Sequence, residues 1–256
     1  MKKPKISIIT VCLNSEKTIE KTILSVINQT YKNIEYIIVD GGSTDKTLEI
    51  IKKYKDKISL WVSEKDNGIY DAMNKGTNLA HGKYLNFMNS DDYFINENVI
   101  ENVLPFLDGK NDIVYGNTKY RYKNLELKIK CLNPNLVWMG TICHQSSFIK
   151  REIIQKYKYN TENKLIADYE FFLNVYYNNG KILKINKFIA SYSILGISGK
   201  NNNQVILDLD KTIKKFDNRL IVRMYCDILG IKPQFNKILH SNKKFGGPTP
   251  DKIKPL

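Results

Sequence analysis

Two adjacent aspartates, Asp91 and Asp92, follow an apolar run in the segment Asn-Ser-Asp-Asp that begins at Asn89. Hard divalent cations prefer oxygen ligands, and Mg²⁺ is commonly held by one or two carboxylates together with substrate phosphates. Such a cation can neutralise the charge that develops on a diphosphate leaving group. The pair therefore predicts a site for Mn²⁺ or Mg²⁺, and a polar turn without a ligand is the alternative interpretation.

Asp40 and Asp71 lie in two further polar clusters. Asp40 ends an apolar run and is followed by Gly41 and a second glycine, which permit a tight turn and close approach of the backbone to a ligand. An aspartate there could accept a hydrogen bond from a nucleotide base, or the turn could only cap a helix. Asp71 and Lys75 are four residues apart and share one face of a predicted helix, where the alternative is a surface ion pair of little energy.

The later part of the chain contains a candidate general base. Asp168 precedes an apolar run and could remove a proton from an acceptor hydroxyl, or it could only cap the helix that follows. His144 is one of three histidines and stands with Gln145 just before an expected strand. A structural and a functional role for this histidine are equally open from its position alone.

Strand and helix signals alternate over the first 120 residues and predict an α/β fold. Continuous apolar runs of strand-forming residues, typical of strands buried on both faces of a parallel sheet, lie at 5–13, 34–40, 58–63 and 84–88. Helical spacing follows the first run, a short helix is expected up to residue 54, and another spans 68–80. Ligands bind at the carboxyl ends of such strands. We therefore expect the polar clusters, which all follow strands, to gather on one rim.

From residue 112 the pattern changes, with strands expected at 113–115, 125–131 and within 182–192, and helices at 152–157 and 169–177. The 256 residues suffice for one large domain with a small C-terminal appendage. No run of 18 apolar residues predicts a membrane span. The N-terminal apolar run fits a buried first strand better than a signal peptide, and four cysteines without paired spacing predict reduced thiols in a cytosolic protein, with no zinc site.

Positive charge is concentrated at the C-terminal end. The chain has a formal net charge of +14, and residues 200–256 contain twelve lysines and arginines against five acidic residues. Apolar residues from Ile206 to Ile228 recur every three or four positions and predict an amphipathic helix, which packs on the parent domain or on a membrane or partner. One hypothesis is peripheral contact of this extension with an anionic membrane.

Four segments together resemble family 2 glycosyltransferases. They read Ile-Ser-Ile-Ile-Thr-Val-Cys-Leu-Asn, Tyr-Ile-Ile-Val-Asp-Gly-Gly-Ser-Thr-Asp, Gly-Ile-Tyr-Asp-Ala-Met-Asn-Lys-Gly and Leu-Asn-Phe-Met-Asn-Ser-Asp-Asp, in the order and spacing of that family. The likeness extends from residue 5 to about 195. It implies a GT-A fold, in which a Rossmann-like, mostly parallel central sheet is flanked by helices. Residues 1–199 would form this domain, with a nucleotide-binding half (1–95) and an acceptor-binding half (96–199), and residues 200–256 a basic helical extension.

The resemblance also implies roles for individual residues. Thr10 and Asn14 would line the nucleotide pocket, Asp40 with Gly41 would contact the base, and Asp71 and Lys75 would lie beside the nucleotide or its ribose. Asp91 would hold ribose or metal, Asp92 metal, and Asp168 would be the catalytic base, with His144 and Gln145 as candidate contacts of the acceptor or a phosphate. Two departures stand out: Asn89 occupies a usually acidic position, and no Gln-x-x-Arg-Trp segment follows Asp168. The second departure favours transfer of a single sugar over processive synthesis.

The sequence thus predicts an inverting, metal-dependent, non-processive glycosyltransferase. The donor would be a nucleotide-sugar, by family habit a UDP-sugar, and the acceptor a saccharide or lipid-linked saccharide in bacterial capsule or O-antigen synthesis, at the cytoplasmic face of the membrane. A nucleotidyltransferase is one alternative, but Asn-Ser-Glu-Lys at 14–17 replaces the glycine-rich phosphate loop it would need. A non-catalytic nucleotide- or nucleic-acid-binding module is the other, suggested by the charge. Acidic strand ends that repel phosphates and the lack of an RNA-binding motif oppose it.

Overall fold

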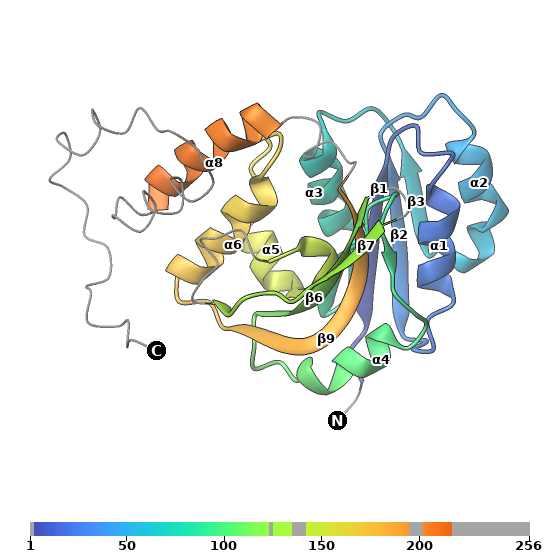
Figure 1. Cartoon of the computed structure of the whole chain (residues 1–256). Coiled ribbons are helices and arrows are strands. Elements are labelled where there is room, and N and C mark those ends of the chain that lie inside the picture. The colour runs from blue at the N-terminus through green and yellow to red at the C-terminus, as the bar shows by residue number, and fades with distance from the viewer. Residues whose placement is uncertain (1–2, 123–124, 135–141, 195–201, 217–256) are drawn as a thin grey trace, which may run out of the picture. The chain divides into compact units, whose positions relative to one another are not determined.

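The computed structural model describes residues 3–122, 125–134, 142–194 and 202–216 (Figure 1). The chain divides into two compact units, Met1–Val205 and Ile206–Leu256, each of which is described by itself. Helix α8 (Asn202–Phe216) crosses this boundary. The amphipathic helix expected from 206 to 228 is present up to Phe216, and its other positions lie outside the described residues. The division of the domain into halves at residue 95 stays a prediction.

Four parallel strands form the first part of the sheet, as the alternation of strand and helix predicted. They are ordered β3, β2, β1, β4. Figure 1 shows α1 and α2 on one face of these strands and α3 on the other. The strands are β1 (Ile6–Cys12), β2 (Ile34–Asp40), β3 (Leu60–Ser63) and β4 (Tyr84–Phe87), and the helices are α1 (Ile19–Ile27), α2 (Thr47–Lys53), the 3₁₀ helix η1 (Lys55–Lys57) and α3 (Ile69–Leu79).

Burial explains why these strands read as continuous apolar runs. Every residue of β1 and β4 is buried, and in β2 only Ile34 is partly exposed, because helices cover both faces. At the edge of the sheet, β3 is partly exposed along its length. Apolar side chains on both faces of the central strands therefore fix their positions.

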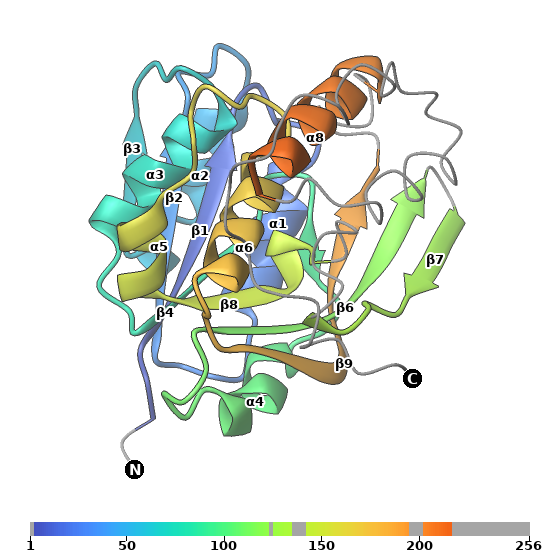
Figure 2. The same ribbon diagram turned by 90° about the vertical axis from the view of Figure 1, so that its left-hand side faces the viewer.

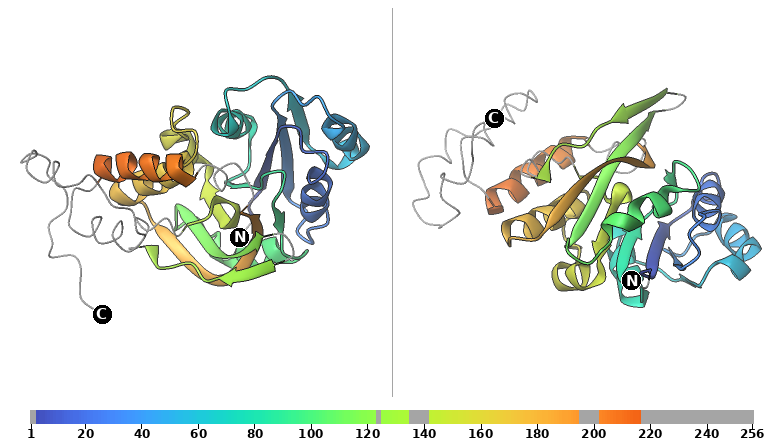
Figure 3. Two further views of the ribbon diagram at one scale, coloured as in Figure 1. Left: turned by 45° about the horizontal axis from the view of Figure 1, so that its top comes forward. Right: turned by 90° about the horizontal axis from the view of Figure 1, so that it is seen from below.

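Beyond β4 the sheet becomes mixed and mostly antiparallel (Figures 2 and 3). Strand β8 pairs antiparallel with β4 and β6, β9 runs parallel to β6, and β5 and β7 pair antiparallel with β9 and β6. These strands are β5 (Tyr93–Phe94), β6 (Ile113–Tyr122), β7 (Leu125–Ile129), β8 (Ser147–Lys150) and β9 (Ile182–Ser193). The remaining elements are α4 (Val99–Val103), η2 (Leu104–Phe106), η4 (His144–Ser146), α5 (Arg151–Tyr157) and α6 (Ala167–Tyr177).

Several boundaries in this second part differ from the expected ones. β6 extends to Tyr122 instead of ending at Tyr115, because its polar outer half pairs with both β7 and β9. β9 is one strand of 12 residues, and β7 ends at Ile129 instead of Cys131. The α/β fold is confirmed, and the parallel arrangement is confined mainly to β1–β4 and the β6–β9 pair.

Two further expectations can be compared with the described residues. No helix there is long and apolar enough to cross a membrane. Cys12, Cys131 and Cys143 are free thiols. The fourth cysteine, Cys226, lies outside the described residues.

A buried glutamate anchors the amino end of the parallel strands. Glu35 on β2 is 7% exposed. Its carboxylate accepts hydrogen bonds from Ser7 Oγ at 2.6 Å, the His81 amide at 2.7 Å and Lys5 Nζ at 3.2 Å. Burial alone would raise the pKa of Glu35, but these donors lower it to about 2. The network joins β1, β2 and the turn before β4.

We expect Glu35→Gln to destabilise the fold by about 2–3 kcal/mol at neutral pH, because a pKa unit corresponds to about 1.4 kcal/mol. A lowered pKa stabilises the fold above the unfolded value of about 4.3, and this contribution is lost as pH falls through the folded value. Urea unfolding between pH 7 and pH 2 would measure both effects. Glu20→Gln, which breaks an exposed pair with Lys53, is the control and should change little. Equal stability of the Glu35 variant and the parent would contradict the network's contribution.

Candidate donor and catalytic site

The loops after β1, β2 and β4 are tied together at the carboxyl end of the sheet. Asn14 has a left-handed backbone conformation, with φ of 48°, which asparagine tolerates better than most residues. Its side-chain Oδ1 accepts a hydrogen bond from the Thr44 main-chain amide at 2.9 Å, and its own main-chain amide donates to Ser43 Oγ at 2.8 Å. Ser15 Oγ lies 2.8 Å from Ser90 Oγ in the loop after β4. The polar clusters that follow separate strands therefore meet on one rim, as predicted.

Asp40 shapes the turn after β2. Its fully buried carboxylate accepts hydrogen bonds from the amides of Gly42 and Ser43, the hydroxyls of Ser43 and Ser63, and the thiol of Cys12. Burial alone would raise the pKa of Asp40, but the bonds from Ser43 and Ser63 hold it below its ordinary value. The geometry gives Asp40 a structural role, and its contact with a base stays a prediction.

Asp66 lies against this turn from the end of β3, and sequence reasoning did not select it. A Cβ atom at Gly41 would collide with the Asp66 carboxylate where it now lies, so the glycine leaves room for this close approach. The carboxylate is half-buried, and its Oδ1 accepts a hydrogen bond from the Gly68 amide at 2.9 Å. The glycine pair after Asp40 was the available signal, because it predicted a close approach to the backbone without naming the partner.

Asp71 and Lys75 lie on the rim, next to the loop that contains Asp66. Asp71 Oδ2 accepts a hydrogen bond from the Asn67 amide at 3.0 Å and lies 3.8 Å from Lys75 Nζ. Lys75 Nζ also lies 2.9 Å from Glu64 Oε1, and its side chain is 28% exposed. The pair thus cross-links the loop after β3, and its side chains remain accessible to a ligand.

Thr10 does not join these groups. Its side chain is fully buried in the core, where Oγ1 lies 3.0 Å from the Tyr36 hydroxyl. Thr10 precedes the end of β1 by two residues, and this position places it beneath the rim. The predicted contact of Thr10 with a nucleotide finds no support in the structure.

The aspartate pair after β4 divides into one engaged and one more accessible carboxylate. Asp92 is 1% exposed, and its carboxylate accepts hydrogen bonds from the Ser193 amide at 2.9 Å and from Gln145 Nε2 at 2.7 Å. Asp91 is partly exposed, and Arg121 donates a hydrogen bond to its main-chain oxygen. Burial raises the pKa of both carboxyl groups, more strongly for Asp92, where the Asp91 charge adds to the effect. The geometry favours Asp91 over Asp92 as a metal ligand.

Asn89 lies two residues before Asp91 in the same loop and carries a second candidate oxygen ligand. The side chain is 9% exposed, and its Oδ1 is buried without a hydrogen-bond partner in the described part of the chain. An unpaired buried oxygen costs free energy, and a cation beside it would offset that cost. No group of three or more His, Cys, Asp or Glu side chains within the described ranges is placed to hold a metal ion. The donor set therefore fits an Mg²⁺ or Mn²⁺ ion that takes most of its ligands from phosphate and water.

Asp168 lies in the first turn of α6 and is held from two sides. Its Oδ1 accepts a hydrogen bond from the Tyr70 hydroxyl at 2.8 Å, and Oδ2 lies 2.8 Å from His144 Nδ1. Burial alone would raise the pKa of Asp168, but His144 and Tyr70 hold it below its ordinary value. The side chain keeps 23% of its surface exposed. Asp168 is thus ionised, oriented and accessible, as a general base must be.

His144 and Gln145 are buried and contact the loop that carries the aspartate pair. His144 Nε2 lies 3.1 Å from Asn89 Nδ2, so the imidazole bridges Asp168 and the loop of the aspartate pair. Gln145 is 1% exposed and holds Asp92. Their burial favours a supporting role over the predicted direct contact with acceptor or phosphate, which stays untested.

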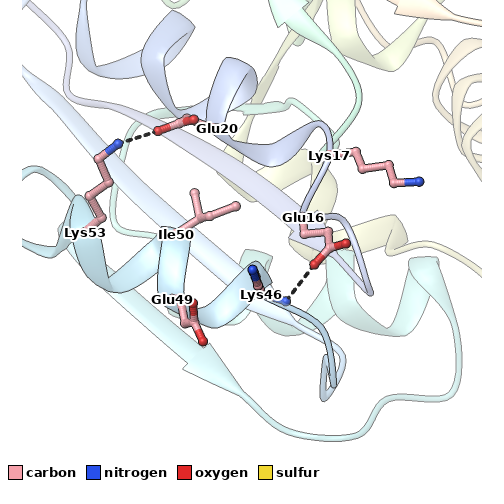
Figure 4. Close-up of a pocket in the computed structure, with 7 residues that line it drawn as sticks. All are labelled: Glu16, Lys17, Glu20, Lys46, Glu49, Ile50 and Lys53. Carbon is pink, nitrogen blue, oxygen red and sulfur yellow. Dashed lines mark hydrogen bonds and ion pairs between the residues drawn. The ribbon is translucent and has the colours of Figure 1, made fainter.

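One surface pocket lies away from these groups (Figure 4). It has a volume of about 460 Å³, is formed by α1, α2 and the residues before each of them, and is lined by charged side chains with Ile50. Lys53 Nζ lies 2.7 Å from Glu20 Oε1, and Glu16 accepts a hydrogen bond from the Lys46 amide. Because the pocket contains none of the rim residues described above, we do not assign the site to it.

Comparison with known proteins agrees with this arrangement. A family model described as Glycosyl transferase family 2 matches residues 7–177. The PGL/p-HBAD biosynthesis glycosyltransferase of Mycobacterium bovis is 30% identical over 203 residues, which cover 77% of this chain and 79% of the relative. An uncharacterized glycosyltransferase of Haemophilus influenzae is 33% identical over 186 residues, covering 68% and 72%.

Solved structures share the fold at lower identity. S. aureus TarS has a TM-score of 0.67 and 22% identity, and the match covers 91% of this chain and 44% of TarS. A shorter TarS in complex with UDP-GlcNAc has a TM-score of 0.66 and 21% identity, with coverage of 88% and 71%. The mannosyltransferase PcManGT from Pyrobaculum calidifontis, in complex with GDP-Man and Mn²⁺, has a TM-score of 0.64 and 16% identity, with coverage of 84% and 65%. The fold is that of the GT-A glycosyltransferases, and the chain belongs to glycosyltransferase family 2.

Proposed function

We propose that the protein transfers a single sugar from a nucleotide-sugar to an acceptor hydroxyl, with inversion at the anomeric carbon and Asp168 as the base. The supporting observation is the chain of contacts from Asp168 through His144 to Asn89. It holds the base in a fixed relation to the loop that carries Asp91. A transferase that joins donor and acceptor needs this relation, because a displaced base loses much of its rate advantage.

The proposed reaction uses the accessible side of Asp168. An acceptor hydroxyl donates its proton to the carboxylate as its oxygen attacks the anomeric carbon. The new bond to that carbon forms on the face opposite the diphosphate, whose bond to the same carbon breaks with both electrons leaving on the phosphate oxygen. Tyr70 and His144 orient the carboxylate for this transfer. The configuration at the anomeric carbon is therefore inverted.

The donor would lie on the rim formed by the strand ends. Asn14 and Asp66 would face the nucleoside, in the turn region that Asp40 shapes, with Asp71 and Lys75 at its side. Asp91 and Asn89 Oδ1 would hold Mg²⁺ or Mn²⁺, which, when bound, neutralises charge on the leaving diphosphate. UDP is our choice of nucleotide, because TarS structures with UDP and UDP-GlcNAc share the fold. The complex of PcManGT with GDP-Man and Mn²⁺ supports the metal.

For the acceptor we propose a saccharide, free or carried on a lipid, in bacterial surface polysaccharide synthesis, at the cytoplasmic face of the membrane. A relative in M. bovis is named as a glycosyltransferase of PGL/p-HBAD biosynthesis, and this supports a role in a biosynthetic pathway. The chain lacks the Gln-x-x-Arg-Trp segment after Asp168, which supports transfer of one sugar at a time.

Asp168→Asn should lower kcat about 10²–10⁴-fold, because a general base contributes about that factor. The affinity for UDP should change little, since Asp168 does not contact the donor in this proposal. Turnover measured with a set of UDP-sugars would give kcat, and calorimetry with UDP would give the affinity. Asp108 is an exposed aspartate that accepts a hydrogen bond from the Lys110 amide, and Asp108→Asn is the matched control. Undiminished turnover of the Asp168 variant would leave this residue only a helix-terminal role.

Asp91→Asn should abolish the dependence of UDP binding on Mn²⁺, because it removes the accessible carboxylate. Asp92→Asn should keep that dependence and instead lower the melting temperature, because it disturbs the bonds from Gln145 and the Ser193 amide. Titration calorimetry with UDP, in Mn²⁺ and in EDTA, separates the two. The reverse pattern, with metal dependence lost only in the Asp92 variant, would refute the assignment.

His144→Ala should move the acid limb of the kcat profile to higher pH. His144 is the main group that lowers the pKa of Asp168, so its loss lets burial raise that pKa. The carboxylate then becomes protonated, and inactive as a base, at a higher pH. His144→Gln, which keeps a donor, should move the limb less. The profile would be recorded over the pH range where circular dichroism reports folded protein. A fall in kcat without any shift of the limb would assign His144 to packing alone.

A further inference from the structure

The outer half of β6 and strand β7 form an antiparallel ribbon, Lys119–Lys130, that alternates strictly between two kinds of side chain. Apolar and aromatic residues occupy every second position of each strand, and charged residues occupy the others. The register places Tyr120 opposite Leu127 and Tyr122 opposite Leu125. Because side chains of directly paired residues lie on the same side of a sheet, the ribbon has one apolar face and one charged face.

The apolar face is open. Leu125 is 67% exposed, Leu127 64% and Ile129 41%. Tyr120 continues this face inward, since its ring packs edge-on against Tyr192 at a centroid distance of 5.3 Å. Figure 2 shows β7 at the outer edge of this part of the sheet. Three adjacent exposed branched side chains on one strand are unusual for a surface and indicate an interaction site.

The charge of the ribbon is strongly positive. Its twelve residues include five lysines and arginines and a single acidic residue, Glu126. Lys119 Nζ lies 2.7 Å from Glu126 Oε1, and Arg121 is directed to the main chain of Asp91. Lys128 is exposed on the edge strand, and Lys130 is exposed directly after it. Lys128 lies on the charged side of β7, and its flexible stem, like that of Lys130, can carry the ammonium group around the exposed edge to anionic lipid headgroups while the apolar groups of the other face insert below them.

We propose that the ribbon docks the protein on an anionic lipid bilayer. Charge argues against two other occupants of the apolar face, a second copy of the protein and its own residues 217–256. Lysine on an edge strand opposes pairing with a second copy, and Lys128 lies on β7 with Lys130 directly after it. Residues 217–256 of the chain carry eight lysines and arginines against three acidic residues and so repel the ribbon. An anionic bilayer complements both the charge and the apolar face.

Docking would also position the site. Arg121 belongs to the ribbon. Its guanidinium donates hydrogen bonds to the main-chain oxygen of Asp91 and to Ser191 Oγ, and it lies 4.7 Å from the centroid of the Tyr93 ring. Strand β6, which pairs with β7, thus contacts the loop of the aspartate pair through Arg121. That the acceptor is presented from this bilayer rests on the proposed function, whereas docking itself does not.

The test is co-sedimentation of the full chain with vesicles of phosphatidylcholine, with and without phosphatidylglycerol, at low and high salt. We expect binding to the anionic vesicles at low salt. Leu125→Gln/Leu127→Gln should weaken it roughly tenfold or more, because it removes apolar groups that enter the bilayer. Leu24→Gln/Leu60→Gln, two exposed leucines on α1 and β3, is the matched control and should bind like the parent. Lys128→Gln/Lys130→Gln should weaken binding only where phosphatidylglycerol is present.

Three results would overturn the proposal. The first is no binding of the parent to anionic vesicles at low salt. The second is equal binding by the parent and the Leu125/Leu127 variant, which would assign the contact to residues 200–256 instead. The third is a parent dimer in light scattering that the leucine variant converts to a monomer, which would make this face an interface between copies. Melting temperatures of all variants establish that they are folded. No step of the test uses sugar transfer, so docking and the proposed function fail separately.

Discussion

A carboxylate taken out of water must be surrounded by donors or by a cation, and this requirement organises one end of the molecule. The sheet brings several aspartates together because ligand-binding loops follow the carboxyl ends of its strands. Asp40 meets the requirement with five hydrogen bonds and Asp92 with two. Four of these seven bonds, those from Cys12, Ser63, Gln145 and the Ser193 amide, join segments distant in sequence, so satisfying the buried charges helps to fix the loops.

The exposure of each carboxylate then sorts the aspartates into anchors and candidate ligands. Asp40 and Asp92 are enclosed and serve as anchors, while Asp66 and Asp91 keep surface that a ligand can reach. Asp168 is intermediate, because Tyr70 and His144 orient it without enclosing it. Asn89, at a position where an acid is usual, donates to the histidine that holds the base. An amide can donate there, whereas an ionised carboxylate could only accept.

Much of the fold could be predicted from sequence, because apolar runs in β1, β2 and β4 leave few alternatives to a buried parallel sheet. The length of β6 could not, since its polar outer half is stabilised by pairing with residues of β9 about 70 positions away, whereas the strand signal within 182–192 did predict β9. Resemblance selected Asp91, Asp92 and Asp168, but it gave Asp92 the metal and Asp91 ribose or metal and so missed the difference in how the two carboxylates are held. That difference comes from Gln145 and Ser193, which lie 53 and 101 residues away in the chain. Thr10, selected by resemblance, is in the core because strand position, not residue type, decides which side chains reach the rim.

The central claim is that hydrogen bonding, and not position in a motif, decides which aspartate is free to bind. A crystal structure of the protein with UDP and Mn²⁺ tests it most directly. The account predicts that the Asp91 carboxylate contacts the metal while Asp92 keeps its bonds to Gln145 and to the Ser193 amide. A structure in which Asp92 has left those partners to bind the metal, with Asp91 turned away, would contradict it.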